Sequence, residues 1–296
     1  MSIFEGAGVA LITPMNQDGS VNYEKLEEIL EMQIEGGTDA IISCGTTGEA
    51  STLSEEEHIN CIKFTCEKVA GRVPVIAGTG SNSTATAIEL TKDAEKCGAD
   101  ALLVVTPYYN KATQQGLKGH FSAIAAQTKL PIILYNIPGR TGVKIEAETI
   151  VDLWKNVDNI VGVKDAIGDL SETAKVLSLS DGGVDVYSGN DDIVVPLMSL
   201  GGKGVISVLS NIIPKETHEM VAACLEGDYK KAASMQLKYY DLIKALFMEV
   251  NPIPVKKAMN LMGFNVGSLR LPLTEMEDAH AKVLASEMEK AGIKLA

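Results

Sequence analysis

Short apolar runs alternate with longer amphipathic stretches along most of this 296-residue chain. The runs are rich in β-branched residues and bounded by polar segments, which is typical of strands buried in a parallel sheet. The stretches between them show helical spacing of apolar residues, as in Tyr23–Ile34, and the Ser54–Val69 stretch opens with a capping-box pattern. Eight runs are predicted as strands: Gly6–Thr13, Thr38–Gly45, Val73–Gly80, Ala99–Thr106, Pro131–Asn136, Ile160–Ile167, Asp185–Gly189 and Gly204–Ser210.

The regular alternation of strand and helix predicts the fold class. Strands that alternate with helices form parallel sheets, and eight such units are the number that closes a (β/α)8 (TIM) barrel. We therefore expect an α/β chain whose residues 1–213 form the catalytic barrel. The strand signal stops beyond that point, so residues 214–296 are expected to form a C-terminal helical domain. Its predicted helices are His218–Leu225, Asp228–Phe247, Pro254–Met262 and Thr274–Ala291.

Composition and charge exclude several classes of partner. The chain is 46% hydrophobic with a net charge of −13, which disfavours nucleic acids and a polybasic membrane anchor. No apolar run reaches the roughly 18 residues of a membrane span, and the first residues lack a signal-peptide pattern. The 5 cysteines are irregularly spaced, as is typical of reduced thiols, so a cytoplasmic protein is expected. The histidines form no i, i+4 pair, and no metal site is expected.

The most informative residue is Lys164, which interrupts the apolar run Ile160–Ile167. Lysine is rarely buried unless it is paired or functional. Desolvation favours the neutral amine, which is a nucleophile that can form a Schiff base with a carbonyl substrate. Gly162 and Ala166 share its strand face and are expected to leave room for substrate. The alternative is a lysine at a strand end that extends its amine to water.

Other candidate residues follow the predicted strands, where the active-site groups of such barrels lie. The turn Gly45–Glu49 contains Thr46 and Thr47, and its backbone N–H groups and hydroxyls could bind a small carboxylate, although glycine and threonine are also common in plain turns. Arg140 could bind a second carboxylate with two parallel hydrogen bonds, or be a solvated loop residue.

Tyrosines also gather at the predicted strand ends, at Tyr108, Tyr109 and Tyr135. They could simply pack in the core with their hydroxyls satisfied. A Schiff-base aldolase, however, must move protons to and from the imine and the substrate methyl group. A tyrosine hydroxyl can do so when it is connected to further hydroxyls, for which Thr46 and Tyr109 are candidates.

Taken together, these motifs resemble the class I aldolase family of dihydrodipicolinate synthase and N-acetylneuraminate lyase. The resemblance spans essentially the whole chain and rests on Gly45–Glu49, Tyr108–Asn110, Tyr135–Gly142 and Val163–Asp165. It implies that Lys164 forms the imine with pyruvate and that Tyr135 is the proton donor and acceptor. It also implies that Thr46 and Tyr109 complete the proton relay, with Tyr109 reaching in from a neighbouring subunit.

The resemblance further implies the substrates and the assembly. Thr47, Gly189 and the backbone near Ile206 would bind pyruvate, and Arg140 would bind the carboxylate of L-aspartate-4-semialdehyde. Condensation would give 4-hydroxy-tetrahydrodipicolinate and water, the first committed step of lysine biosynthesis through diaminopimelate. Neither a metal nor an organic cofactor would be needed, and the assembly would be a homotetramer built as a dimer of dimers.

Three alternatives remain at this point. A sister pyruvate aldolase, such as N-acetylneuraminate lyase or a 2-keto-3-deoxy-sugar-acid aldolase, would take a polyhydroxylated acceptor, whereas Arg140 favours a short carboxylated aldehyde. A ligand-binding barrel without catalysis would gain nothing from a desolvated Lys164 beside Tyr135. A phosphate-binding barrel isomerase would use the glycines at Gly189, Gly201 and Gly202, but no clear acid–base pair accompanies them.

The resemblance also bears on regulation. Relatives that lysine inhibits tend to carry a Ser-Ala pair after the first motif, then a histidine and a glutamate. Here the corresponding positions are Ala50-Ser51, Glu55 and Thr86, while Asn82, Tyr108 and His58 remain. Because Thr86 is neutral, a partner for the effector's ammonium is missing. Weak or absent feedback by lysine is therefore predicted.

Overall fold

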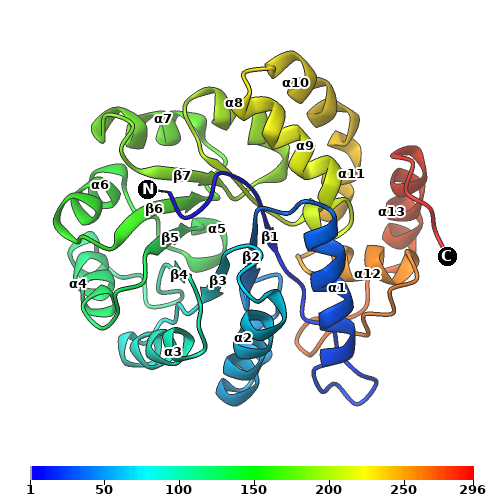
Figure 1. Ribbon diagram of the computed structural model, residues 1–296, viewed down its shortest axis with the longest axis horizontal. Coiled ribbons are helices and arrows are strands. Elements are labelled where there is room, and N and C mark those ends of the chain that lie inside the picture. The colour runs from blue at the N-terminus through cyan, green and yellow to red at the C-terminus, as the bar shows by residue number, and fades with distance from the viewer. Residues whose placement is uncertain (1) are drawn as a thin grey trace.

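Eight parallel strands close into a barrel in the computed structural model, which describes residues 2–296. Each strand pairs with the next along the chain, and β8 pairs with β1, with Gly8 opposite Ile206 (Figure 1). The strands are β1 (Gly6–Ala10), β2 (Ala40–Ser43), β3 (Val75–Gly78), β4 (Ala101–Val105), β5 (Ile132–Asn136), β6 (Ile160–Asp165), β7 (Asp185–Ser188) and β8 (Gly204–Ser207). Each lies within one of the predicted runs, so the predicted barrel is confirmed.

Helices surround the barrel on its outer side (Figure 1). α2 begins at the predicted capping box, in which the Glu57 amide donates to the Ser54 hydroxyl and the Ser54 amide donates to the Glu57 carboxylate. The helices up to β8 are α1 (Tyr23–Glu35), α2 (Glu55–Val69), α3 (Thr84–Lys96), α4 (Gln114–Ala125), α5 (Pro138–Thr141), α6 (Ala147–Asn156), α7 (Leu170–Leu179) and α8 (Val194–Ser199). Short 3-10 turns lie at Ala50–Thr52, Asp191–Ile193 and Leu209–Asn211.

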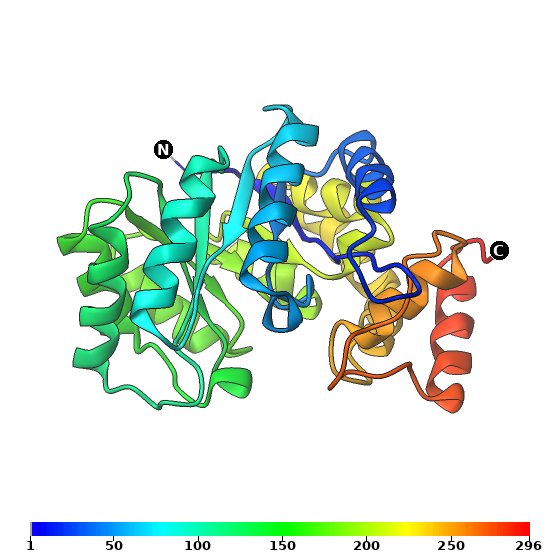
Figure 2. The same ribbon diagram turned by 90° about the horizontal axis from the view of Figure 1, so that it is seen from below.

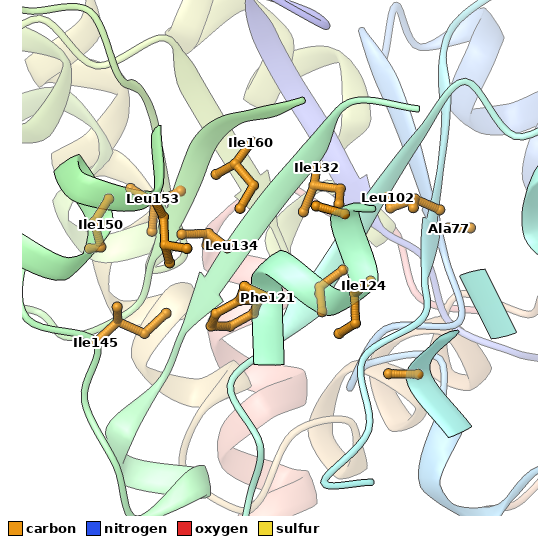
Figure 3. Packing of buried hydrophobic residues seen from close by; sticks show 14 of the residues in the cluster. Ala77, Leu102, Phe121, Ile124, Ile132, Leu134, Ile145, Ile150, Leu153 and Ile160 are labelled. Atoms are coloured by element: carbon orange, nitrogen blue, oxygen red, sulfur yellow. The ribbon is translucent and has the colours of Figure 1, made fainter. Parts of the chain in front are cut away.

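The core has two layers because side chains alternate along each strand. On β5, Leu134 faces outward and packs with Phe121 of α4 between strands and helices (Figure 3). Ile133 and Tyr135 of the same strand face inward and join a smaller cluster inside the barrel. The barrel interior is therefore filled with side chains and is not a channel.

The amino end of the barrel is closed by the residues that precede β1. The ring of Phe4 stacks on that of Tyr187, with 4.5 Å between the ring centroids, and the Tyr187 hydroxyl donates to the Phe4 carbonyl at 2.8 Å. Tyr187 pairs with Gly204, the first residue of β8, and with Lys164 of β6, so the stacked rings fill the barrel interior below the site of Lys164.

The C-terminal part is helical, as predicted. α9 (Pro214–Leu225) packs against β1 and completes the outer ring, after which come α10 (Tyr229–Lys238), α11 (Tyr240–Leu246), α12 (Ile253–Leu261) and α13 (Asp278–Lys290). Figure 2 shows the last of these helices, coloured orange to red, beside the barrel. By packing, α9 belongs to the ring, and the division of the chain at residue 213 stays a prediction.

One predicted helix is divided in the structure. The stretch Asp228–Phe247 was expected to be continuous, but it breaks at Tyr239 into α10 and α11. The two halves pack on different partners, α10 on α8 and α9, and α11 on α13, so tertiary contacts set the break. No helix within residues 2–296 is long and apolar enough to cross a membrane.

Candidate active site

Lys164 and Tyr135 lie side by side inside the barrel. They are opposite each other on the neighbouring strands β6 and β5, and each is only 6% exposed. The Lys164 amine lies 4.3 Å from the centroid of the Tyr135 ring. The sequence-based expectation of a buried lysine is thus met, and the alternative of an amine extended to water does not fit this exposure.

A cavity of about 360 Å³ opens beside Tyr135. Lys164, Thr47, Gly189 and Ile206 are not among the residues that line it. Tyr135 forms part of its wall, together with Thr46 from the turn after β2, Tyr108 from the loop after β4 and Arg140 from α5. The volume is that of a small-molecule site. The carboxyl ends of several strands therefore bring predicted site residues to one cavity, as the barrel topology requires.

The turn after β2 is held in place by buried hydrogen bonds. Thr46 faces the cavity, whereas Thr47 is 3% exposed and its hydroxyl accepts a 2.9 Å hydrogen bond from the side-chain amide of Asn251. The Thr13 hydroxyl donates to the Gly48 carbonyl at 2.7 Å. The turn ends at Glu49, which adopts a left-handed conformation with φ of 54°. The backbone of this turn is thus fixed before any substrate arrives.

Arg140 is carried by a short structured loop. The side chain of Asn136 bonds both the amide and the carbonyl of Ile145, which ties the two ends of the loop together. Within it, α5 spans Pro138–Thr141 and is capped by Gly142, which has a φ of 76°. Arg140 is exposed at the cavity wall, and its guanidinium donates to the Asn251 carbonyl at 3.0 Å. Asn251 therefore contacts both Thr47 and Arg140.

Tyr109 is placed differently from the other candidates. Its side chain is 90% exposed, and its backbone has a φ of 74°, which is unusual for a non-glycine residue. Its amide donates to the Thr141 carbonyl, which fixes the backbone at the mouth of the barrel. The structure therefore does not bring the Tyr109 side chain to Thr46 and Tyr135 within one subunit.

The small residues around Lys164 serve close backbone packing. A Cβ at Gly162 would lie 2.3 Å from the Asp185 carbonyl oxygen on β7, so strand approach, and not the predicted room for substrate, requires this glycine. A Cβ at Gly189 would lie 2.6 Å from the Ala166 Cβ, and the Gly189 amide donates to the Asp165 carbonyl. The predicted site residue Ile206 is fully buried on β8.

A buried carboxylate, which sequence reasoning missed, organises the end of β8. Asp191 is 2% exposed and accepts hydrogen bonds from the Ser207 hydroxyl and from the Val208 and Leu209 amides. Burial raises the pKa of Asp191, while these hydrogen bonds and the nearby Lys164 charge lower it. In the sequence, Asp191 is marked only by its position shortly after the predicted strand Asp185–Gly189, and an aspartate there is equally typical of an ordinary loop.

Two further residues in the C-terminal part were missed. Asn251 joins Thr47 to Arg140, and Lys256 of α12 forms a buried ion pair with Glu49 at 2.8 Å. Both are more than 200 positions from the turn they contact, so no local pattern identifies them. Within the described chain, no group of three histidine, cysteine, aspartate or glutamate side chains is arranged to hold a metal ion.

The strands form a closed barrel, and a buried lysine lies beside a tyrosine inside it. This arrangement is that of a lyase of the class I aldolase type. Comparison with known proteins specifies the group further: the chain belongs to the dihydrodipicolinate synthetase family, whose sequence model matches residues 3–291.

The similar proteins match this chain over nearly its full length. The 4-hydroxy-tetrahydrodipicolinate synthase of Lachnoclostridium phytofermentans is 60% identical over 99% of this chain and 100% of that relative. The synthase of Acetivibrio thermocellus is 56% identical over 98% of each chain. The dihydrodipicolinate synthase of Aquifex aeolicus superposes with a TM-score of 0.97 at 44% identity, covering 99% of both chains. The Acinetobacter baumannii enzyme, solved with pyruvate, gives a TM-score of 0.96 at 47% identity, covering 98% of this chain and 99% of its own.

Proposed function

We propose that this protein is a 4-hydroxy-tetrahydrodipicolinate synthase that condenses pyruvate with L-aspartate-4-semialdehyde through a Schiff base on Lys164. The observation that carries the proposal is the placement of the Lys164 amine 4.3 Å from the Tyr135 ring, with both residues 6% exposed. A lysine amine in this position can attack a carbonyl substrate, and the adjacent phenol is in a position to exchange protons. The pyruvate complex of a 47% identical relative supports this choice of first substrate.

The first half of the reaction forms an enamine. The Lys164 amine attacks the C2 carbonyl of pyruvate, and loss of water gives an imine in which the nitrogen draws electrons from the neighbouring methyl group. Removal of a methyl proton then gives the enamine. Tyr135 would carry these protons, assisted by Thr46 on the same cavity wall. The turn that contains Thr46 and Thr47 would hold the pyruvate carboxylate.

The second half forms one carbon–carbon bond and one ring. The enamine carbon attacks the aldehyde carbon of L-aspartate-4-semialdehyde, whose carboxylate Arg140 would bind. The amino group of that substrate then attacks the imine carbon, closes the six-membered ring and releases the Lys164 amine. Overall, pyruvate and the semialdehyde give the hydroxylated heterocycle and one water.

The position of Tyr109 supports an assembly in which subunits complete one another's sites. Its side chain is 90% exposed in the single chain, although its backbone is fixed next to the mouth of the barrel. An exposed tyrosine on a constrained backbone is suited to insertion into a partner. We propose that Tyr109 of each subunit reaches the proton relay of its neighbour, in a cytoplasmic homotetramer built as a dimer of dimers.

The acceptor distinguishes this function from the sister aldolases. The purified protein would be incubated with pyruvate and either L-aspartate-4-semialdehyde or N-acetylmannosamine, and products would be identified by mass spectrometry. The proposal predicts the condensed heterocycle with the semialdehyde and no aldol product with the sugar. Turnover of the sugar alone would refute the proposed acceptor.

A further inference from the structure

A lysine and a glutamate are buried together behind the turn that faces the cavity. The side chains of Lys256 and Glu49 are 1% and 0% exposed, and the Lys256 amine lies 2.8 Å from a Glu49 carboxylate oxygen. Lys256 comes from α12 in the C-terminal part, whereas Glu49 ends the turn after β2. The mechanism proposed above uses neither residue.

All three donors of the Lys256 ammonium have acceptors. Besides Glu49, it donates to the Ser268 carbonyl at 2.6 Å and to the Thr13 carbonyl at 3.2 Å. An ammonium has three N–H bonds, so the site is fully satisfied and does not call for a further ligand. Burial lowers the pKa of Lys256, and the neighbouring Glu49 carboxylate opposes that shift.

Glu49 connects this lysine to the turn. Its second carboxylate oxygen accepts from the Arg270 amide at 3.0 Å, and its own amide donates to the Thr46 carbonyl at 3.1 Å. Its left-handed backbone is unfavourable for a residue with a side chain, and the surrounding contacts must compensate for it. The Lys256 side chain and the Arg270 backbone amide thus hold Glu49, the residue that sets the direction of the turn.

Stability alone is a weak explanation for this pair. Replacing a buried ion pair with apolar side chains of similar volume is often neutral or stabilising, because desolvation of both charges offsets their attraction. An apolar pair, however, cannot form the directed hydrogen bonds by which the Lys256 amine joins Ser268, Thr13 and Glu49. The arrangement is therefore better suited to fixing geometry than to adding stability.

We propose that Lys256 is a positioning residue for pyruvate binding: through Glu49 it holds the Thr46–Thr47 turn in the geometry that receives the pyruvate carboxylate. This inference rests on the proposed function, because that function gives the turn its role. The inference gives the C-terminal part of the chain a role in the active site, because Lys256 of α12 supports the pyruvate-binding turn from behind. Lys256 does not itself touch substrate.

Three variants test the inference: Lys256→Met, Glu49→Gln and the double variant. Each is assayed at a temperature at which it is folded by circular dichroism, with KM measured separately for the two substrates. Lys256→Met is expected to raise KM for pyruvate by about tenfold or more, because the contacts of the turn to the pyruvate carboxylate lose their alignment. KM for the semialdehyde should stay within about twofold of the wild-type value. The double variant is expected to regain thermal stability relative to Lys256→Met but to keep the raised KM.

Glu57→Gln is the matched control. Glu57 pairs with Arg270, so it ties the same C-terminal segment to α2 without a contact to the turn. This control is expected to lower stability and to leave both KM values unchanged. A Lys256→Met protein with unchanged KM for pyruvate would overturn the inference alone, whereas a wild-type protein that forms no borohydride-trapped pyruvate adduct would overturn the proposed function and the inference together.

Discussion

The Glu57–Arg270 pair should add stability at neutral pH that is lost in acid, and Glu57→Gln should remove this pH-dependent contribution. The two side chains are 31% and 21% exposed, and the Arg270 guanidinium donates to both carboxylate oxygens of Glu57. The hydrogen bonds from Arg270 lower the pKa of Glu57 from 4.5 to about 2. Because the pKa is lowered in the folded state, the pair stabilises the fold above pH 4.5, and this stabilisation is lost as the pH falls from 4.5 toward 2.

The magnitude follows from the size of the shift. The pKa of Glu57 differs by about 2.5 between the unfolded and folded states, which corresponds to at most ~3.4 kcal/mol of unfolding free energy, at ~1.36 kcal/mol per pKa unit. Solvent screening at this partly exposed site reduces the expected value to about 1–2 kcal/mol. At pH 7, Glu57→Gln should therefore lower the free energy of unfolding by that amount, or the melting temperature by about 2–4 °C.

Urea denaturation followed by circular dichroism, at a series of pH values from 7 to 3, measures this effect. The difference between wild type and Glu57→Gln should be constant down to pH 4.5 and shrink below it. Glu148→Gln is a suitable control, because its pair with Lys175 is exposed and should contribute nothing measurable. A difference between wild type and Glu57→Gln that stays constant or grows toward pH 3 would show that Arg270 does not lower the pKa of Glu57 in the folded protein.

Three further predictions concern activity. Tyr135→Phe should lower kcat by about 10²–10⁴-fold while pyruvate still forms an adduct, because only proton transfer is removed; a normal kcat in steady-state assays would contradict this. Arg140→Ala should raise KM for the semialdehyde about tenfold or more and leave pyruvate trapping unchanged, since its role is assigned to the acceptor carboxylate; equal effects on both substrates would count against that role. A relative from Cyanidioschyzon merolae, 42% identical, has been solved with lysine bound. Lysine should inhibit the present protein weakly or not at all because of Thr86, and half-inhibition of the initial rate at sub-millimolar lysine would exclude this.

The elements that were predictable from the sequence are those with a local signal. A buried parallel strand reads as an apolar run whatever its neighbours, which is why all eight strands were located. The break at Tyr239 has no such signal, because neither glycine nor proline marks it and only the different partners of α10 and α11 create it.

The same distinction applies to the site. Thr46, Tyr135 and Arg140 were identifiable because a barrel brings the ends of its strands together, so topology alone predicts their proximity. Lys256 is a lysine on an amphipathic helix, and in the sequence it looks like many that are solvated. Its pairing with Glu49 spans 207 positions and depends on how α12 packs against the barrel, which no spacing rule encodes.

The mass of the intact protein after borohydride reduction in the presence of pyruvate, followed by peptide mapping, tests directly whether Lys164 forms the Schiff base. One reduced pyruvate adduct per chain is expected, located on Lys164 and absent from Lys164→Ala. A folded wild-type protein without an adduct, or an adduct that persists in Lys164→Ala, would contradict the assignment of Lys164 as the Schiff-base residue.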